Sequence, residues 1–568
     1  MIAKNSRSRS PRAFNTTIRA LTVISLNALV ATTSMLAAEF LNKEYPNQSK
    51  VVVMNKSKVP VFTFDSETQE FALKQVRPNN ELIGSKARNL SFLNGLGYVQ
   101  IPKWLSIGTT VFREVVHSNP ILRKNLDVLC SAMEQYAEAS GKDNFEEGIF
   151  KKAGMVRKLV EEITLPDSLV NTIETVFNNI SEHGTKPIAV RSSAKSEDLP
   201  GASFAGLYDS YLNIIDFKAF LDALKMCWAS SFNDRAVQYY MQKEVSLKDS
   251  FMGVVAMQLV KARVSGTVFT TDVTTGYNGI HIMANNGLEG VVGGDISADS
   301  YLINPTNGTI LKRVKGSKEF CYQPNEDGSG VKKIAMTGLN KDYCISPTEA
   351  KELAALIQRV GEDYQQVSKG PVDTEFVINE KGGIEIVQIR PVVTSNVTQV
   401  DDVDFEAIKG KSLNSLAVGK HAVFGVKHGK IKVIEDFHDL ESGMIHIHPD
   451  DIVVTTRTEN QWTQYLTKFS GIITTEGNPT SHPVLISREH GVPCLVGVSD
   501  AVGKFKHLNG EWVTLDGFRK SVYLGKQALK SVSLDKIAEA YRVVEEEKVQ
   551  DEEIMIKDCF LKNFMMRD

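Results

Sequence analysis

Closely spaced cysteines are missing from this sequence. The six cysteines stand apart at positions 130, 227, 321, 344, 494 and 559, and none forms a CxxC pair. This spacing argues against a zinc site or a thiol-redox motif and favours free, buried thiols, although an even count would permit disulfides. A charge excess is also missing, because 65 basic and 68 acidic residues leave a net charge of −3. The charge balance therefore predicts no nucleic-acid partner.

Internal repeats are absent, and only one stretch combines an uncharged run with a basic, acid-free flank. The run, Ala20–Ala38, follows a segment that contains Lys4, Arg7, Arg9, Arg12 and Arg19. This pattern favours a secretory signal in residues 1–38, although Leu36 makes the cleavage site imperfect. The run is also long enough for a membrane anchor. An Arg- and Ser-rich leader further fits an organelle transit peptide or a misplaced start.

The rest of the chain divides by composition into five segments. Residues 39–80 are a polar N-terminal extension with short strand-like pieces, such as 51–55 and 59–64. Residues 81–395 mix helix and strand patterns. Helical periodicity covers 119–140 and 346–367, whereas 252–260, 265–273 and 375–389 have the pattern of strands. Residues 396–412 are a polar, acidic linker. Residues 413–527 hold many short strands, and 528–568 form a charged helical tail.

A histidine, His482, stands at the predicted start of a short helix in the stretch Gly477–Gly497. Pro483 suits the first helical position, and Gly491 with Pro493 marks the end. The free N–H groups of a helix start keep an imidazole neutral and stabilise a phosphoryl group on it. Thr480 and Ser481 add hydroxyl donors. His482 is therefore either an ordinary surface cap residue or a phosphoryl carrier.

A phosphoryl carrier needs a donor, and the stretch Lys186–Asn213 is one candidate site for it. A predicted strand ends in Arg191-Ser192-Ser193, and Arg191 suits bidentate phosphate contact. The loop that follows contains Gly201, Ser203 and Gly206, and such small residues let backbone N–H groups approach phosphate oxygens. A flexible surface loop is the alternative. Lys86, near the start of an upstream helix, could also reach a phosphate or simply be solvated.

A predicted hairpin at Asp373–Pro391 is the second candidate. With residues 380–383 as its loop and Asn379 opposite Ile384, Glu375 faces Gln388 and Asp373 faces Arg390. A carboxylate beside an amide oxygen suits Mg²⁺ held by a nucleotide, with Arg390 near the same phosphates. An ordinary solvent-facing hairpin is the alternative.

Together these segments resemble the phosphoenolpyruvate synthase and pyruvate phosphate dikinase superfamily over residues 80–395 and 413–527. The resemblance is carried by the VRSSA segment, the SFAG loop and the SGTVFTTDVTTG segment. It is carried further by the carrier motif, in which the matching residues are Gly477, Thr480, Ser481, His482, Arg488, Glu489, Gly491, Pro493 and Gly497.

The resemblance implies an α/β multidomain chain, with an ATP-grasp-type nucleotide-binding domain followed by a swivelling phosphohistidine domain. It implies ATP and Mg²⁺ as cofactors and His482 as the catalytic residue, supported by Thr480, Ser481 and Arg488. The implied ATP and phosphate contacts are Lys86, Arg191, Gly201, Ser203, Gly206, Gln258 and Arg390. Of these, Gln258 matches an adenine-contacting glutamine. Glu375 and Gln388 are the implied metal ligands.

The implied reaction carries a phosphoryl group from ATP to His482 and on to a small-molecule acceptor, with pyruvate as the candidate. An antibiotic or a glycan is an alternative acceptor, and a non-enzymatic nucleotide-binding remnant is a further alternative. The family continues into a C-terminal barrel that binds pyruvate, whereas this sequence has about forty residues after the histidine domain. The acceptor site is therefore expected on a separate chain or an unrecognised surface.

Three smaller departures from the family pattern accompany the resemblance. Gly287–Gly290 reads Gly-Leu-Glu-Gly where the family has Gly-Leu-Gly-Glu, which affects the expected geometry of the nucleotide site. Asn478 replaces a glycine, and Pro483 replaces an alanine. The leader favours export or anchoring, whereas the ATP requirement favours an ATP-containing compartment such as the cytoplasm.

Overall fold

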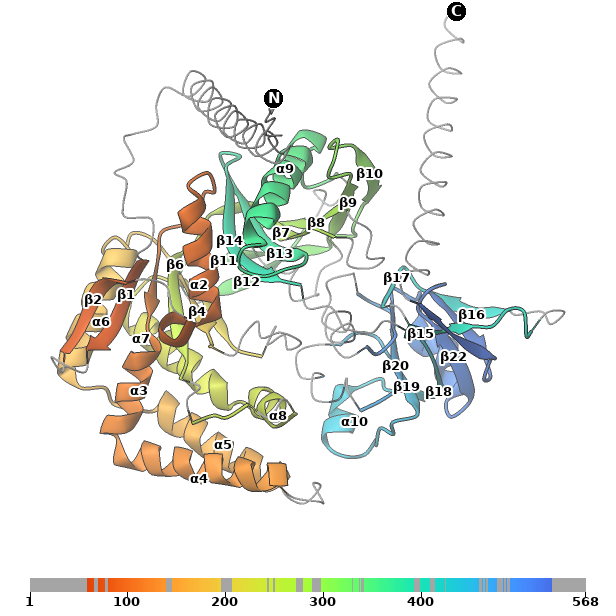
Figure 1. Cartoon of the computed structure of the whole chain (residues 1–568), viewed down its shortest axis with the longest axis horizontal. Helices are drawn as coiled ribbons and strands as arrows, with labels where there is room; N and C mark the ends of the chain where they lie inside the picture. Colours follow the sequence, from red (N-terminus) through yellow and green to blue (C-terminus); the bar gives the residue numbers. More distant parts are fainter. Residues whose placement is uncertain are drawn as a thin grey trace, which may run out of the picture. The chain divides into compact units, whose positions relative to one another are not determined.

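The computed structural model describes residues 59–533 with internal gaps. The gaps are 66–69, 77–79, 139–145, 196–206, 243–244, 249–250, 272–278, 289–297, 329, 337, 339–341, 393–398, 409–413, 424, 459–461, 463–464, 466–467, 478–483, 485–486 and 488–490. The described elements form three main sheets with helices packed against them (Figure 1).

The first sheet has the strand order β2-β1-β3-β6-β4-β5. Its strands are β1 (Val59–Asp65), β2 (Glu70–Val76), β3 (Trp104–Ile107), β4 (Ile188–Ser193), β5 (Ser210–Ile214) and β6 (Gly253–Gln258). The helices that share its core are α3 (Thr109–Ser118), α4 (Pro120–Glu138), α5 (Glu146–Glu161), α6 (Asp167–Ile180), α7 (Phe217–Ala229) and α8 (Asp234–Gln242). A 3-10 turn, η1 (Ser230–Phe232), joins α7 to α8.

The second sheet has the order β10-β9-β8-β7-β13-β14. Its strands are β7 (Ala262–Phe269), β8 (Ile280–Asn286), β9 (Asp299–Ile303), β10 (Ile310–Val314), β13 (Val372–Asn379) and β14 (Ile384–Pro391). Helix α9 (Pro347–Tyr364) packs on it, and β11 (Phe320–Pro324) pairs with β12 (Val331–Ala335). Helix α2 (Asn80–Leu96) buries Ile83, Leu90 and Leu93 in a core that includes residues of both sheets.

The third sheet has the order β16-β23-β22-β18-β19-β20-β21-β17. Its strands are β16 (Ser415–Val418), β17 (His421–Val423), β18 (Val426–Val433), β19 (Asp451–Thr455), β20 (Gly471–Thr474), β21 (Cys494–Val496), β22 (Trp512–Asp516) and β23 (Ser521–Leu524). Short helices α10 (Phe437–Glu441), α12 (Ala501–Phe505) and η4 (Lys506–Leu508) accompany it. A separate ribbon pairs β15 (Gln399–Val403) with β24 (Leu529–Ser533).

Three predicted boundaries need correction. Part of the N-terminal extension, 39–80, belongs to the first sheet: the strand expected at 59–64 is confirmed as β1, which pairs in parallel with β3, and β2 pairs with β1. Part of the linker, 396–412, and of the tail, 528–568, forms the ribbon instead of a linker and a helix. Val403 and Ile408 pack with Phe518, and Arg519 Nη1 lies 2.6 Å from Asp402 Oδ1. Polar composition hid these strands, because a two-stranded ribbon needs few apolar side chains.

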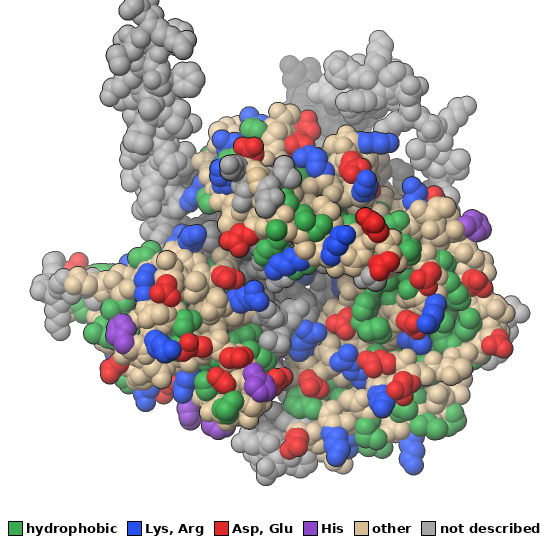
Figure 2. Space-filling view, turned by 180° about the vertical axis from the view of Figure 1, so that it is seen from behind, with side chains coloured by type: hydrophobic (Ala, Val, Ile, Leu, Met, Phe, Trp, Pro, Cys, Tyr) green, Lys and Arg blue, Asp and Glu red, His purple; other side chains and the backbone are tan. Residues whose placement is uncertain are grey.

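The predicted helices at 119–140 and 346–367 are confirmed as α4 and α9, and the predicted strands as β6, β7, β13 and β14. Free, buried thiols are confirmed at the five described cysteines, 130, 227, 321, 344 and 494. None of the helices in the described part has the length and apolarity needed to span a membrane. Basic and acidic side chains are interspersed on the face drawn in Figure 2, in line with the balanced charge.

Candidate functional site

Arg191 on β4 meets the second sheet through three hydrogen bonds. Its Nη2 donates to Glu375 Oε2 and to Gln388 Oε1, each at 2.7 Å, and its Nη1 donates to the carbonyl of Val387 at 3.2 Å. The side chains of Arg191 and Glu375 are only 16% and 13% exposed. The structure therefore brings three predicted site residues, from two different sheets, into one contact.

A β-bulge sets this geometry. The sequence predicts Asn379 opposite Ile384, but Ile378 holds that place. Val387 is then an extra residue between two pairs, so that Glu375 faces Gln388 and Asp373 faces Arg390, as predicted. Because a bulged residue lies outside the regular pairing, its carbonyl is available to other donors. Here the carbonyl of Val387 accepts from Arg191.

Positive charge around Glu375 keeps its carboxylate ionised. Burial raises the pKa of Glu375, but the charges of Arg191, Arg390 and Lys86 and the bond from Arg191 outweigh burial, so the pKa lies below its ordinary value. Arg390 Nη2 itself lies 2.6 Å from Asp373 Oδ2. Asp373 thus holds the second predicted phosphate-contacting arginine beside the first.

Three oxygen-bearing side chains stand in one row across β7, β13 and β14. Thr267 pairs with Glu375, and Glu375 pairs with Gln388, so all three share a face. The Thr267 hydroxyl is buried and has no hydrogen-bond partner among the described residues. Sequence analysis missed this residue, because a threonine in a strand carries no distinctive signal.

The Glu375–Gln388 pair fits a hard cation. Both oxygens lie 2.7 Å from the same nitrogen, Arg191 Nη2, so they converge on one point that already holds positive charge. Carboxylate and amide oxygens are ligands that Mg²⁺ accepts, with phosphate oxygens and water completing its shell. Among the described residues no group of three His, Cys, Asp or Glu side chains could hold a metal by itself. The protein side chains at this place would therefore supply two ligands of a cation, and phosphate oxygens or water would supply the others.

The backbone of α2 is fastened to the end of β4, and this brings Lys86 to the site. Gly84, with φ +72° and ψ 175°, interrupts the helix. The Ser193 hydroxyl donates to the carbonyl of Ile83 and accepts from the Ala87 N–H, at 2.8 and 3.1 Å. Lys86 is half-buried within this turn, and its charge acts on Glu375.

The same helix is tied to the second sheet at Asn89. Its Nδ2 donates to the carbonyl of Ile389 at 2.9 Å, and its Oδ1 accepts from the Tyr364 hydroxyl at 3.0 Å. Asn89 is fully buried and therefore positions Lys86 relative to β14. It is a second residue that sequence analysis missed.

We expect Gly84→Ala to destabilise the protein strongly. A Cβ at this position would lie 1.9 Å from the backbone oxygen of Ser193, and the backbone conformation is one that only glycine adopts readily. The loss in free energy of unfolding should be about 4 kcal/mol, measured by urea denaturation.

Gly97→Ala is the matched control. Gly97 has the same φ of +72°, but a Cβ there meets nothing within 4 Å. This substitution should cost about 1 kcal/mol. Equal losses for the two variants would contradict the role of the close contact with Ser193.

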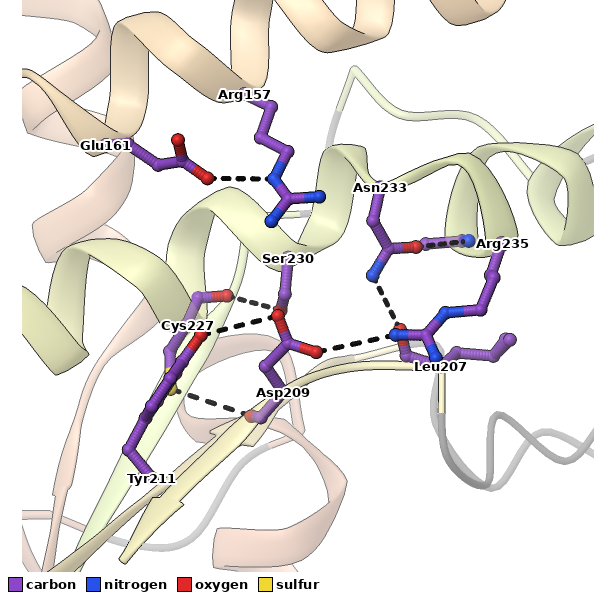
Figure 3. A network of polar contacts seen from close by, with 10 residues as sticks. Arg157, Glu161, Leu207, Asp209, Tyr211, Cys227, Ser230, Asn233 and Arg235 are labelled. Carbon is purple, nitrogen blue, oxygen red and sulfur yellow. Dashed lines mark hydrogen bonds and ion pairs between the residues drawn. The ribbon is translucent and has the colours of Figure 1, made fainter. Parts of the chain in front are cut away.

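The segment that leaves the predicted phosphate loop is held firmly (Figure 3). Asn233 Nδ2 donates to the carbonyl of Leu207 at 2.9 Å, and Arg235 Nη2 lies 3.5 Å from Asp209 Oδ1. The Tyr208 hydroxyl bonds that of Tyr240 at 2.6 Å. Three successive residues are thus anchored by α8 and the turn before it. Gly201, Ser203 and Gly206 themselves lie outside the described residues.

Gln258 stands apart from the Arg191 contact. It pairs with Ile188 at the other end of β4, and its Nε2 donates to the carbonyl of Ile180 and to Glu182 Oε1, each at 3.0 Å. The structure does not bring it to Glu375, and an adenine contact stays a prediction.

The carrier motif is described only in part. Thr480, Ser481, His482 and Arg488 lie outside the described residues, whereas Val484 and Ser487 are helical and buried. Gly491 has φ +65°, and the N–H of Val492 donates to the carbonyl of Ser487 at 2.9 Å. This is the hydrogen bond of a glycine-terminated helix, which confirms the predicted end. Gly287 is described, with φ +75°. The two residues that depart from the family order, Glu289 and Gly290, lie outside the described residues.

Two protein families match the chain. Residues 80–407 match "Pyruvate phosphate dikinase, AMP/ATP-binding domain", and residues 447–520 match "PEP-utilising enzyme, mobile domain". The first match confirms the predicted fold class, α/β with an ATP-grasp-type nucleotide-binding domain, and confirms ATP as a ligand.

Curated relatives agree with these matches. A "Probable phosphoenolpyruvate synthase" of Methanothermobacter thermautotrophicus is 33% identical over 65% of this chain and 52% of its own length. Another, from Pyrococcus horikoshii, is 27% identical over 78% of this chain and 56% of its own length. The phosphoenolpyruvate synthase of Escherichia coli is 29% identical, over 78% and 54%. The chain therefore spans about half the length of these relatives.

Proposed function

Because the chain belongs to the pyruvate phosphate dikinase family, we propose that it transfers a phosphoryl group from ATP to His482 and then to an acceptor. The observation that carries this proposal is the contact of Arg191 with Glu375 and Gln388. It gathers, at one place in an ATP-binding domain, a phosphate-binding arginine and a pair of cation ligands. An ordinary solvent-facing hairpin would leave these groups exposed and apart.

Mg²⁺ would be held by Glu375 and Gln388, and when bound it would neutralise charge on the transferred phosphoryl group. Lys86, Arg191 and Arg390 would bind the other phosphate oxygens. Their positions are fixed by the α2 turn, by β4 and by the Asp373 ion pair. Such preset positive groups stabilise the transition state without rearrangement.

His482 would attack the β-phosphorus of ATP, and the bond from that phosphorus to the oxygen of the α-phosphate would break, releasing AMP. Hydrolysis of the outer phosphate would leave a phosphohistidine. A helix start favours both the neutral, nucleophilic ring and the phosphoryl group that it receives. Thr480, Ser481 and Arg488 would support this loop.

Pyruvate is the acceptor that we propose, because the curated relatives are phosphoenolpyruvate synthases.

Labelled ATP tests the proposal directly. The protein is incubated with Mg²⁺ and with ATP labelled at either the β or the γ phosphate, and bound label is tested for acid lability and base stability. We expect retained β label and release of AMP. Binding of ATP without covalent label would overturn the proposal and favour a regulatory nucleotide-binding protein.

A further inference from the structure

We propose that Arg191 occupies the cation position of the nucleotide-free protein, and that cation and nucleotide binding are coupled through its displacement. This inference rests on the proposed function, in which Glu375 and Gln388 hold the cation. It adds an order to that function: the arginine must move toward phosphate before both oxygens can take a metal.

The first argument is geometric. One nitrogen, Arg191 Nη2, bridges the Glu375 and Gln388 oxygens and lies 2.7 Å from each. A cation that binds both oxygens must come within about 2.1 Å of each of them. That point lies inside the space that Nη2 fills, so the two positive groups exclude each other.

The second argument is electrostatic. The Glu375 side chain is mostly buried, and its Oε2 lies 2.7 Å from Arg191 Nη2 in an ion pair. Removal of Arg191 without replacement would take from a mostly buried carboxylate the cation that is hydrogen-bonded to it, which is unfavourable. The arginine therefore leaves readily only when a cation takes its place.

The third argument concerns where the arginine can go. Glu375 and Gln388 are both bound by the one nitrogen Nη2, whereas a phosphate group offers a guanidinium a forked contact through two nitrogens. The Nη1 bond to the bulged Val387 carbonyl is separate from the Nη2 contacts. Arg191 can thus exchange its Nη2 partners for phosphate oxygens while a cation enters between Glu375 and Gln388. Free cation alone provides no such alternative partner.

Coupling of this kind is reciprocal and measurable. The probe is Mn²⁺ alone, whose free concentration is followed by electron paramagnetic resonance, with no nucleotide present. Wild-type protein should bind it weakly. Arg191→Gln should bind it about tenfold more tightly, because the competing charge is gone. This gain of cation binding should accompany a loss of ATP binding.

Arg263→Gln is the matched control, because Arg263 also lies in an ion pair with a glutamate, Glu349, away from the site. It should leave Mn²⁺ affinity unchanged. The double variant Arg191→Gln, Glu375→Gln should lose the gain, which locates the bound ion. Arg191→Lys keeps a charge beside Glu375 and serves if Arg191→Gln does not fold. It should give a smaller gain, of about threefold.

The outcomes separate the two proposals. If wild-type protein binds Mn²⁺ with a non-hydrolysable ATP analogue through Glu375, but neither Arg191 variant raises nucleotide-free affinity, the displacement idea is wrong and the proposed function stands. If Glu375→Gln leaves Mn²⁺ binding unchanged even with the analogue, the proposed cation site is wrong, and this inference fails with it.

Discussion

Replacing His482 with alanine should abolish covalent labelling of the protein by β-labelled ATP. The imidazole would supply the attacking nitrogen, and alanine offers no nucleophile in its place. AMP formation should fall about 10³-fold or more, whereas ATP binding should persist. Labelling is measured by scintillation counting of base-treated protein, and ATP binding by calorimetry.

His507→Ala is the control for this variant. His507 is an exposed histidine of the same domain, in η4, and it has no part in the proposed transfer. It should label at the wild-type rate. Base-stable label that survives in His482→Ala would mean that another residue carries the phosphoryl group.

Replacing Glu375 with glutamine should slow labelling about 10²- to 10³-fold, because the cation loses its one charged protein ligand. Size and shape are preserved, so the effect comes from charge. The pKa of Glu375 lies below the ordinary value of 4.5, so the carboxylate stays ionised as pH falls to that value. The labelling rate of wild-type protein should therefore show no loss from Glu375 between about pH 5 and 7.

Glu349→Gln is matched to this substitution. Glu349 also pairs with an arginine, Arg263, and its pKa is also lowered, but it lies at the start of α9. Its loss should cost about 1 kcal/mol of stability and leave the labelling rate unchanged. A rate loss equal to that of Glu375→Gln would indicate a general effect of breaking a glutamate–arginine pair.

Much of the site was predictable from residue types and strand register. Arg191 at a strand end, and Glu375 opposite Gln388, follow from local patterns that the fold preserves. The predicted pairing of Asn379 with Ile384 was nevertheless wrong by one residue. The bulge at Val387 offsets this error, so that Glu375 still faces Gln388. A bulge leaves little trace in sequence, because one extra residue in a strand disturbs no composition.

Residues that act through long-range contacts were not predictable. Asn89 forms hydrogen bonds with Tyr364 and Ile389, which lie 275 and 300 positions further along the chain. The Thr267 hydroxyl has a role only because the strand pairing places it beside Glu375. The sequence around Gly84 does not indicate that its backbone lies against that of Ser193. Such roles depend on which segments meet in space, and short-range periodicity contains no such information.

The ribbon of β15 and β24 brings together the two ends of the segment that contains the third sheet. The first residue of this segment, Gln399, pairs with Ser533 at the end of β24, so the segment begins and ends at one place. A module with adjoining ends can be inserted into a host loop, or removed from one, with little strain on either partner. A gene fragment for residues 399–533 is therefore suited to transplantation between proteins, and to permutation by joining its ends and opening a turn elsewhere.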